Sequence, residues 1–150
     1  MTIFGVCPDC GANVQGGREG CQALWHELFY GTGLTHSAAF DAYCMQHLET
    51  YCASAKSYAA HLTRLACGLE YEAAAFVYSA IQKWLNGNRH LTKPASLPFL
   101  GTMTIADVYE AETAVARHKA TQAWVESVWA AYGPQHDLAH AWIKEALALT

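Results

Sequence analysis

Three cysteines near the start of the chain have the spacing of metal ligands. Cys7 and Cys10 enclose two residues and are followed directly by Gly11, in the form of a zinc knuckle. At this spacing two thiolates can face one ion while the glycine lets the chain turn back. Cys21 follows where the glycine-rich segment gives way to helix-forming sequence. We therefore predict that these three thiols bind one zinc ion.

The fourth ligand has three candidates. We favour His47, with His26 next because it follows Cys21 by five residues, and Cys44 is a further alternative close to His47. The alternatives to a metal site are a redox pair of Cys7 and Cys10, or inert thiols. A thioredoxin-type pair, however, follows a strand and opens a helix, and neither flank fits that pattern here.

The stretch from His36 to His47, HSAAFDAYCMQH, concentrates polar chemistry on one predicted helix. At helical spacing, Phe40 and Tyr43 fall on one stripe with the two terminal histidines, and Asp41 lies beside it. The two histidines lie about 16 Å apart along such a helix, so they cannot bind the same ion. The stretch is therefore expected to join two sites, one at each end.

A second group of residues suits acid–base chemistry. Asp41 could accept a proton from one imidazole and fix its tautomer, leaving the other nitrogen free as a base or a metal ligand. His136 and His140 have the i, i+4 spacing that allows both to bind a second ion, with His61 as a third ligand. For each histidine alone, capping a helix or satisfying a buried carbonyl is the alternative. The predicted functional centre contains His36, Asp41, Tyr43, His61, His118 and His136, with Tyr43 orienting the substrate.

Helices must position these side chains. The apolar pattern predicts helices over residues 21–30, about 36–53, 57–70, 71–85 and 112–132, and a last one beginning at Pro134. Thr35 or Ser37 is expected to cap the second of these, and Thr104 with Asp107 to open a helical turn. Residues 5–20 carry five glycines and are expected to form neither helix nor strand. The predicted fold is an all-α, compact bundle of about five to six helices with an N-terminal zinc-knuckle loop.

Residues 86–103 form the one long segment without periodicity, and they include Pro94 and Pro98. Irregular segments of this length often cover functional sites. We predict that this one lies over the mouth of a pocket and is the most mobile part of the chain.

Composition limits the classes of function. The 150 residues suit a single domain, with residues 1–20 as the metal-knuckle loop and 21–150 as the helical bundle. The formal net charge of −4 gives no basic surface for nucleic acid. No apolar run approaches the ~20 residues of a membrane span, and the first ten residues lack a signal-peptide layout. We expect a cytoplasmic protein, in which the six cysteines are thiols or metal ligands and not disulfides.

The order of these motifs resembles a family of small bacterial proteins catalogued only as a domain of unknown function. The resemblance runs from Cys7 to about Trp142, and it is carried by the CPDCG opening, the H-x4-DAY-x2-QH block and the tryptophan-rich segment RHKATQAWVESVWAAYGPQH. In the family pattern a proline follows the QH dipeptide; Leu48 stands there in this chain, so its helix is expected to run further. The resemblance implies no activity. The positions it singles out are Cys7, Cys10, Cys21, His36, Asp41, Tyr43, His47, His61, His118 and His136.

Two hypotheses of function follow. The first is a small zinc-binding enzyme, metal-dependent or acid–base, that acts on a small molecule in a pocket lined by histidines. The alternative is a non-catalytic, zinc-stabilised helical module that binds a protein partner. Neither hypothesis involves nucleic acid or a membrane, and a homo-oligomer is compatible with both. No phosphate loop, dinucleotide fingerprint or nucleophile elbow is present in the sequence.

Overall fold

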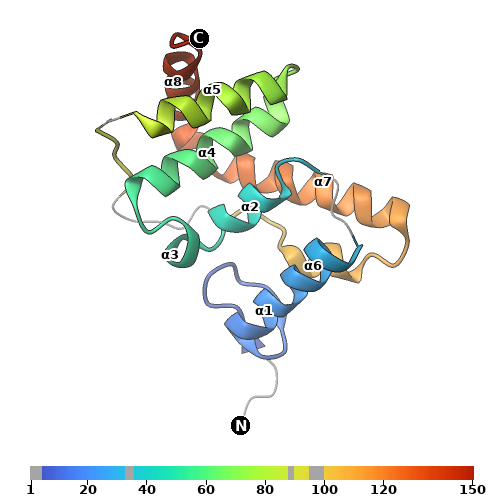
Figure 1. The fold of residues 1–150 in the computed structure, drawn as a ribbon. Helices are drawn as coiled ribbons and strands as arrows, with labels where there is room; N and C mark the ends of the chain where they lie inside the picture. The colour runs from blue at the N-terminus through green and yellow to red at the C-terminus, as the bar shows by residue number, and fades with distance from the viewer. Residues whose placement is uncertain (1–4, 33–35, 88–89, 95–99) are drawn as a thin grey trace.

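Helices account for nearly all of the regular structure (Figure 1). The structure is a computed structural model that describes residues 5–32, 36–87, 90–94 and 100–150. Two short strands, β1 (Gly5–Val6) and β2 (Asn13–Val14), pair antiparallel. A π-helical segment, Glu27–Thr32, continues the first helix, and a 3₁₀ turn, Gly133–Gln135, precedes the last. The α-helices are α1 (Gly17–His26), α2 (Ala39–Met45), α3 (Leu48–Tyr51), α4 (Ala55–Glu70), α5 (Ala74–Asn86), α6 (Ile105–Glu110), α7 (Ala114–Ala131) and α8 (His136–Leu147).

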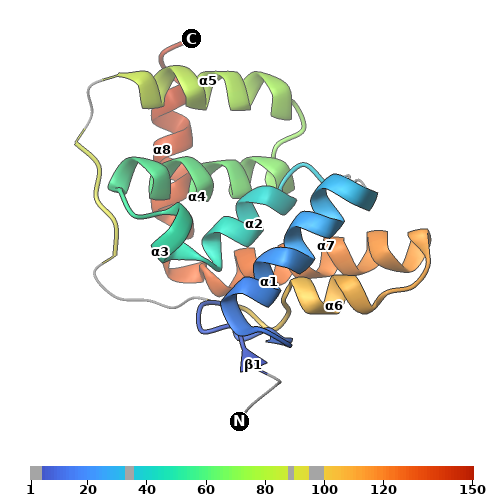
Figure 2. The same cartoon turned by 60° about the horizontal axis from the view of Figure 1, so that its bottom comes forward.

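Helix α4 is central to the packing. It contacts α2, α5, α7 and α8, and α7 also contacts α2 and α6. Figure 2 shows α5 above α4, with α8 crossing behind both and α7 beneath. The N-terminal hairpin and α1 form a separate end of the molecule, where α1 contacts α6. The core is rich in aromatic residues, and its largest fully buried side chains include Trp84, Trp124, Tyr43, Tyr58 and Tyr132.

The all-α class is confirmed, and most predicted helices are present. Helices α4, α5, α7 and α8 match the apolar periodicity within a few residues at each end. The Thr104 capping box also forms, since Thr104 Oγ1 accepts from the Ala106 amide at 3.2 Å and Asp107 Oδ2 accepts from the Thr104 amide at 2.8 Å. The helix number of five to six was too low: the described residues contain eight, partly because one predicted helix is divided.

The division falls at Gln46 and His47, where the sequence predicted an unbroken helix over 36–53. His47 has φ −134° and ψ 58°, which is outside the helical region, so α2 ends at Met45 and α3 begins at Leu48. Leu48 in place of proline therefore does not prolong the helix. The predicted cap at Ser37 is also wrong, because α2 begins after Ala38 without a side-chain cap; Thr35 lies outside the described residues.

The glycine-rich N-terminus is more regular than the sequence suggested. The turn at the knuckle is closed by the Gly11 amide donating to the Cys7 carbonyl at 2.9 Å and the Cys7 amide donating to the Ala12 carbonyl at 2.8 Å. Gly11 has φ 83°, a left-handed conformation that favours glycine. The turn reverses the chain, so the flanking residues pair as β1 and β2, and α1 begins already at Gly17.

The segment 86–103 forms no helix or strand in its described part beyond Asn86, and two side chains hold it. Lys93 Nζ donates to the Cys52 and Ala53 carbonyls at 3.0 and 2.8 Å. The Gln46 amide donates to the carbonyls of Leu100 and Met103. Pro98 lies outside the described residues, and the role of the segment as a mobile cover stays a prediction. Among the helices that the structure describes, none has the length and apolar character needed to cross a membrane.

Candidate functional site

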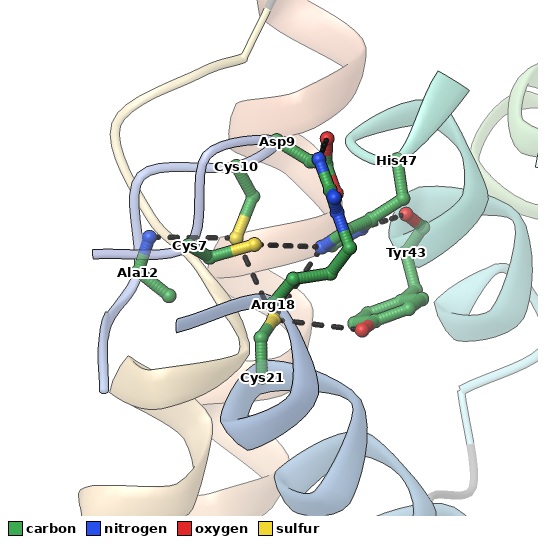
Figure 3. A network of polar contacts seen from close by, with 8 residues as sticks. All are labelled: Cys7, Asp9, Cys10, Ala12, Arg18, Cys21, Tyr43 and His47. Carbon is green, nitrogen blue, oxygen red and sulfur yellow. Dashed lines mark hydrogen bonds and ion pairs between the residues drawn. The ribbon is translucent and has the colours of Figure 1, made fainter. Parts of the chain in front are cut away.

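Four potential metal ligands meet where the N-terminal hairpin contacts the helices (Figure 3). The Sγ atoms of Cys7, Cys10 and Cys21 and one ring nitrogen of His47 all lie within 4.8 Å of one another, and all four residues are buried. Cys7 follows β1, Cys10 lies in the turn, Cys21 lies in α1, and His47 lies between α2 and α3. The sequence predicted this set.

The spacing of these atoms fits one tetrahedral ion. Cys10 Sγ lies 3.7 Å from Cys21 Sγ, and His47 Nε2 lies 3.7 Å from Cys7 Sγ and 3.4 Å from Cys21 Sγ. A tetrahedral zinc ion with Zn–S bonds of about 2.3 Å and a Zn–N bond of about 2.0 Å requires S···S separations of about 3.8 Å and S···N separations of about 3.5 Å. These three separations are therefore close to those that a tetrahedral ion requires, and all four donor atoms lie within 4.8 Å of one another.

Tyr43 orients the ring of His47. His47 Nδ1 donates to the Tyr43 carbonyl at 2.7 Å, which leaves the Nε2 lone pair facing the thiols. The two rings stack with centroids 3.9 Å apart. The Tyr43 hydroxyl lies 3.5 Å from Cys21 Sγ, and burial raises the pKa of Tyr43, so it acts as a hydrogen-bond donor to that sulfur. Tyr43, predicted to orient a substrate, thus supports the metal ligands.

The thiols of the cluster differ from one another. A hydrogen bond from Cys10 lowers the pKa of Cys21 against the opposing effect of burial, whereas burial raises the pKa of Cys7 and the bond to Cys21 raises the pKa of Cys10. Outside the cluster, burial raises the pKa of Cys52 to about 12 and of Cys67 to about 11, so these thiols remain protonated. All six cysteines lie within the described residues and are free of disulfide bonds.

The cluster is covered from solvent by an ion pair. Arg18 Nε donates to Asp9 Oδ2 at 2.9 Å, and Figure 3 shows the Arg18 side chain crossing in front of the His47 ring, beside the sulfur atoms. The cavity between Arg18, Asp9 and His47 has a volume of only about 50 Å³, too small for an organic substrate. A centre with four protein ligands and no room for a substrate is typical of structural metal sites, whereas catalytic sites keep an open coordination position.

The two alternative fourth ligands lie elsewhere. His26 is exposed at the end of α1, where its ring contacts Tyr30. Cys44 is buried in α2, and its carbonyl accepts from the Cys52 thiol at 3.7 Å. The structure therefore places His47 with the cysteines, and neither of the others.

Asp41 and His61 form the one hydrogen-bonded pair among the predicted acid–base residues of the described chain. His61 Nδ1 donates to Asp41 Oδ1 at 2.8 Å across the α2–α4 contact. Asp41 is buried, and its burial raises the pKa of the carboxyl group, against the lowering effect of the His61 bond. His61 Nε2 makes no hydrogen bond to any residue that the structure describes.

A pocket of about 320 Å³ lies on the α4–α5 side of His61. It is lined by Ser54, Lys56, Ser57, Ala60, His61, Arg64, Gln82 and Leu85. None of the described residues of 90–103 is part of this lining, so the predicted cover is not in contact with it there.

The remaining histidines do not join Asp41 and His61 in one cluster. His36 accepts from the Ala38 amide at 3.1 Å, and burial lowers its pKa, with a smaller lowering effect from nearby, exposed His118 on α7. His136 Nε2 donates to the Trp129 carbonyl at 2.6 Å, and its ring stacks on Trp129.

The second metal site predicted from His61, His136 and His140 is not formed either. His61 is paired with Asp41, and His140 Nε2 lies 2.6 Å from Glu70 Oε1. Within the described ranges, the cysteine–histidine cluster is the only group of three or more such side chains at ligand spacing.

Gln46 is the residue that the sequence analysis missed. Its buried side chain donates to two carbonyls of the 100–103 segment and accepts from Trp124 Nε1 at 2.9 Å. The signal that could have identified Gln46 was its position beside His47 in the QH dipeptide. Lys56 and Arg64 were also missed, although they lie on the same face of α4 as His61.

Comparison with known proteins places the chain in a wider group. A family model described as a family of unknown function (DUF5946) matches residues 5–133. That span contains the four potential ligands, Asp41 and His61, and it ends before α8. None of the curated proteins and none of the solved structures matches the chain.

Proposed function

The chain belongs to DUF5946, a family of unknown function, and we propose from its own residues that it is a zinc-binding protein whose Cys3His centre is structural. The observation that carries the proposal is the tetrahedral spacing of four buried donor atoms. Three thiolates and one imidazole are a typical ligand set of structural zinc.

The role of such a centre follows from where its ligands lie. Two of them belong to a hairpin with strands of two residues each, which is too short to be stable alone. The third lies in α1, and the fourth at the α2–α3 junction of the bundle. A bound ion joins these elements, so metal-binding free energy contributes directly to folding of the N-terminal part.

Cobalt substitution tests whether the centre is closed. The protein refolded with Co²⁺ should show the intense visible absorption of a tetrahedral thiolate site, and added cyanide or azide should leave the spectrum unchanged. The reason is that protein side chains fill all four positions. A spectrum that shifts with either anion would indicate an open position and contradict the structural assignment.

A second function, acid–base catalysis on a small molecule, is favoured by the Asp41–His61 pair. Asp41 fixes the proton on Nδ1 of His61, and the unbonded Nε2 is then free to accept a proton from a ligand. His61 also lines a pocket large enough for a small metabolite. This function uses two of the six predicted catalytic residues and does not require the metal.

The tautomer of His61 tests this second function. Nitrogen NMR of the wild-type protein at neutral pH should show the proton on Nδ1 of His61, and Asp41→Ala should abolish that preference. His136 is an internal control, because its Nε2 donates to a carbonyl and should carry the proton in both proteins. A wild-type His61 with its proton on Nε2 would rule out the proposed base.

A further inference from the structure

The pocket beside His61, defined by its eight lining residues, has a charge opposite to that of the whole protein. The chain contains 13 acidic and nine basic residues. The lining includes two of those basic residues, Lys56 and Arg64, and no aspartate or glutamate.

Arg64 is oriented without being neutralised. Its Nη2 donates to Gln82 Oε1 at 2.6 Å, and Gln82 Nε2 donates in turn to Asn86 Oδ1 at 3.0 Å. In the described part of the chain, neither Arg64 nor Lys56 forms an ion pair with a carboxylate. The remaining guanidinium donors and the ammonium group are therefore available to a ligand.

Along α4, the two basic residues Lys56 and Arg64 lie on either side of His61. Lys56, His61 and Arg64 are five and three residues apart on one helix, and all three line the pocket. Arg64 is close enough to Asp41 to lower the pKa of its carboxyl group, although burial has the larger, opposite effect. The Asp41 carboxylate is itself hydrogen-bonded to His61.

We infer that this pocket binds a small-molecule anion, with a phosphate or carboxylate group held by Arg64 and Lys56 next to His61 Nε2. The inference rests on the proposed acid–base role of His61, for which it names the substrate class. A divalent cation would find no carboxylate ligand in this lining, and an apolar ligand would find little apart from Ala60 and Leu85. A planar guanidinium and an ammonium group that line the same pocket instead match an oxyanion.

Titration of the full-length, zinc-loaded protein with inorganic phosphate tests the inference, at constant pH and ionic strength. The NMR signals of the His61 ring and the Arg64 side chain should shift and saturate. The double variant Lys56→Gln/Arg64→Gln should weaken phosphate binding about tenfold or more. The matched control Lys119→Gln/Lys144→Gln removes the same charge from exposed positions on α7 and α8 and should bind phosphate like the wild type.

Shifts that do not saturate, or equal weakening in the two double variants, would overturn the anion site. The outcome is separate from that of the tautomer measurement. Saturable phosphate binding with the His61 proton on Nε2 would keep the anion site and remove the acid–base role. A His61 proton on Nδ1 without phosphate binding would keep the acid–base role and remove the anion site.

Discussion

Replacing Cys10 by serine is expected to release the metal and to lower the free energy of unfolding by roughly 3–5 kcal/mol. Cys10 supplies one of four buried donors, and it also receives a hydrogen bond from the Ala12 amide at 3.4 Å, so it holds the knuckle turn as well as the ion. Serine is a poor zinc ligand at neutral pH, because its hydroxyl remains protonated. Denaturant unfolding followed by circular dichroism measures the loss, and hydrogen exchange should localise it to residues 5–26.

Cys52→Ser is the matched control. Cys52 is equally buried, but its thiol contacts the Cys44 carbonyl and lies outside the cluster. This variant should keep the metal and lose no more than about 1.5 kcal/mol of stability. Equal losses in the two variants would mean that Cys10 is only a packed thiol.

Replacing Gln46 by alanine is expected to lower the free energy of unfolding by about 2–4 kcal/mol without loss of the metal. The substitution removes three hydrogen bonds in a buried position and leaves Trp124 Nε1 and the Leu100 and Met103 carbonyls without their partner. Unsatisfied buried polar groups cost more than the net gain from a hydrogen bond. Thermal or denaturant unfolding, combined with zinc analysis, checks both parts of this prediction.

Gln122→Ala provides the comparison, because the Gln122 side chain is only half-buried and bonds to exposed Glu126 on the same helix and to His36. Its loss should change stability by less than about 0.5 kcal/mol. A Gln46 variant as stable as this control would show that the 100–103 segment is held by other contacts.

The local features of the fold were predictable from sequence because neighbouring residues determine them. The Thr104 capping box, the apolar stripe of α7 and the Cys7–Cys10 knuckle each depend on spacings of a few residues. Cys21 and His47 also joined the predicted metal set, although His47 lies 40 residues from Cys7. For the fourth ligand, the residue types that bind metal limited the choice to His47, His26 and Cys44.

The break in the 36–53 helix and the fate of the histidines depend on tertiary contacts. Residues 39–51 have ordinary helical propensity, and the chain leaves the helix at Gln46 and His47 because their side chains bond to partners far away in sequence. His118 has the correct phase on α7, but the first turns of that helix are mostly exposed beyond the core. Apolar periodicity identifies which face of a helix is buried. It does not show how many turns of that face other elements cover.

X-ray absorption at the zinc edge, on full-length protein purified without chelators, tests the metal assignment most directly. We expect one zinc ion per chain, bound by three sulfur atoms at about 2.3 Å and one imidazole nitrogen at about 2.0–2.1 Å. Absence of stoichiometric zinc, or a coordination shell of oxygen and nitrogen without sulfur, would contradict it.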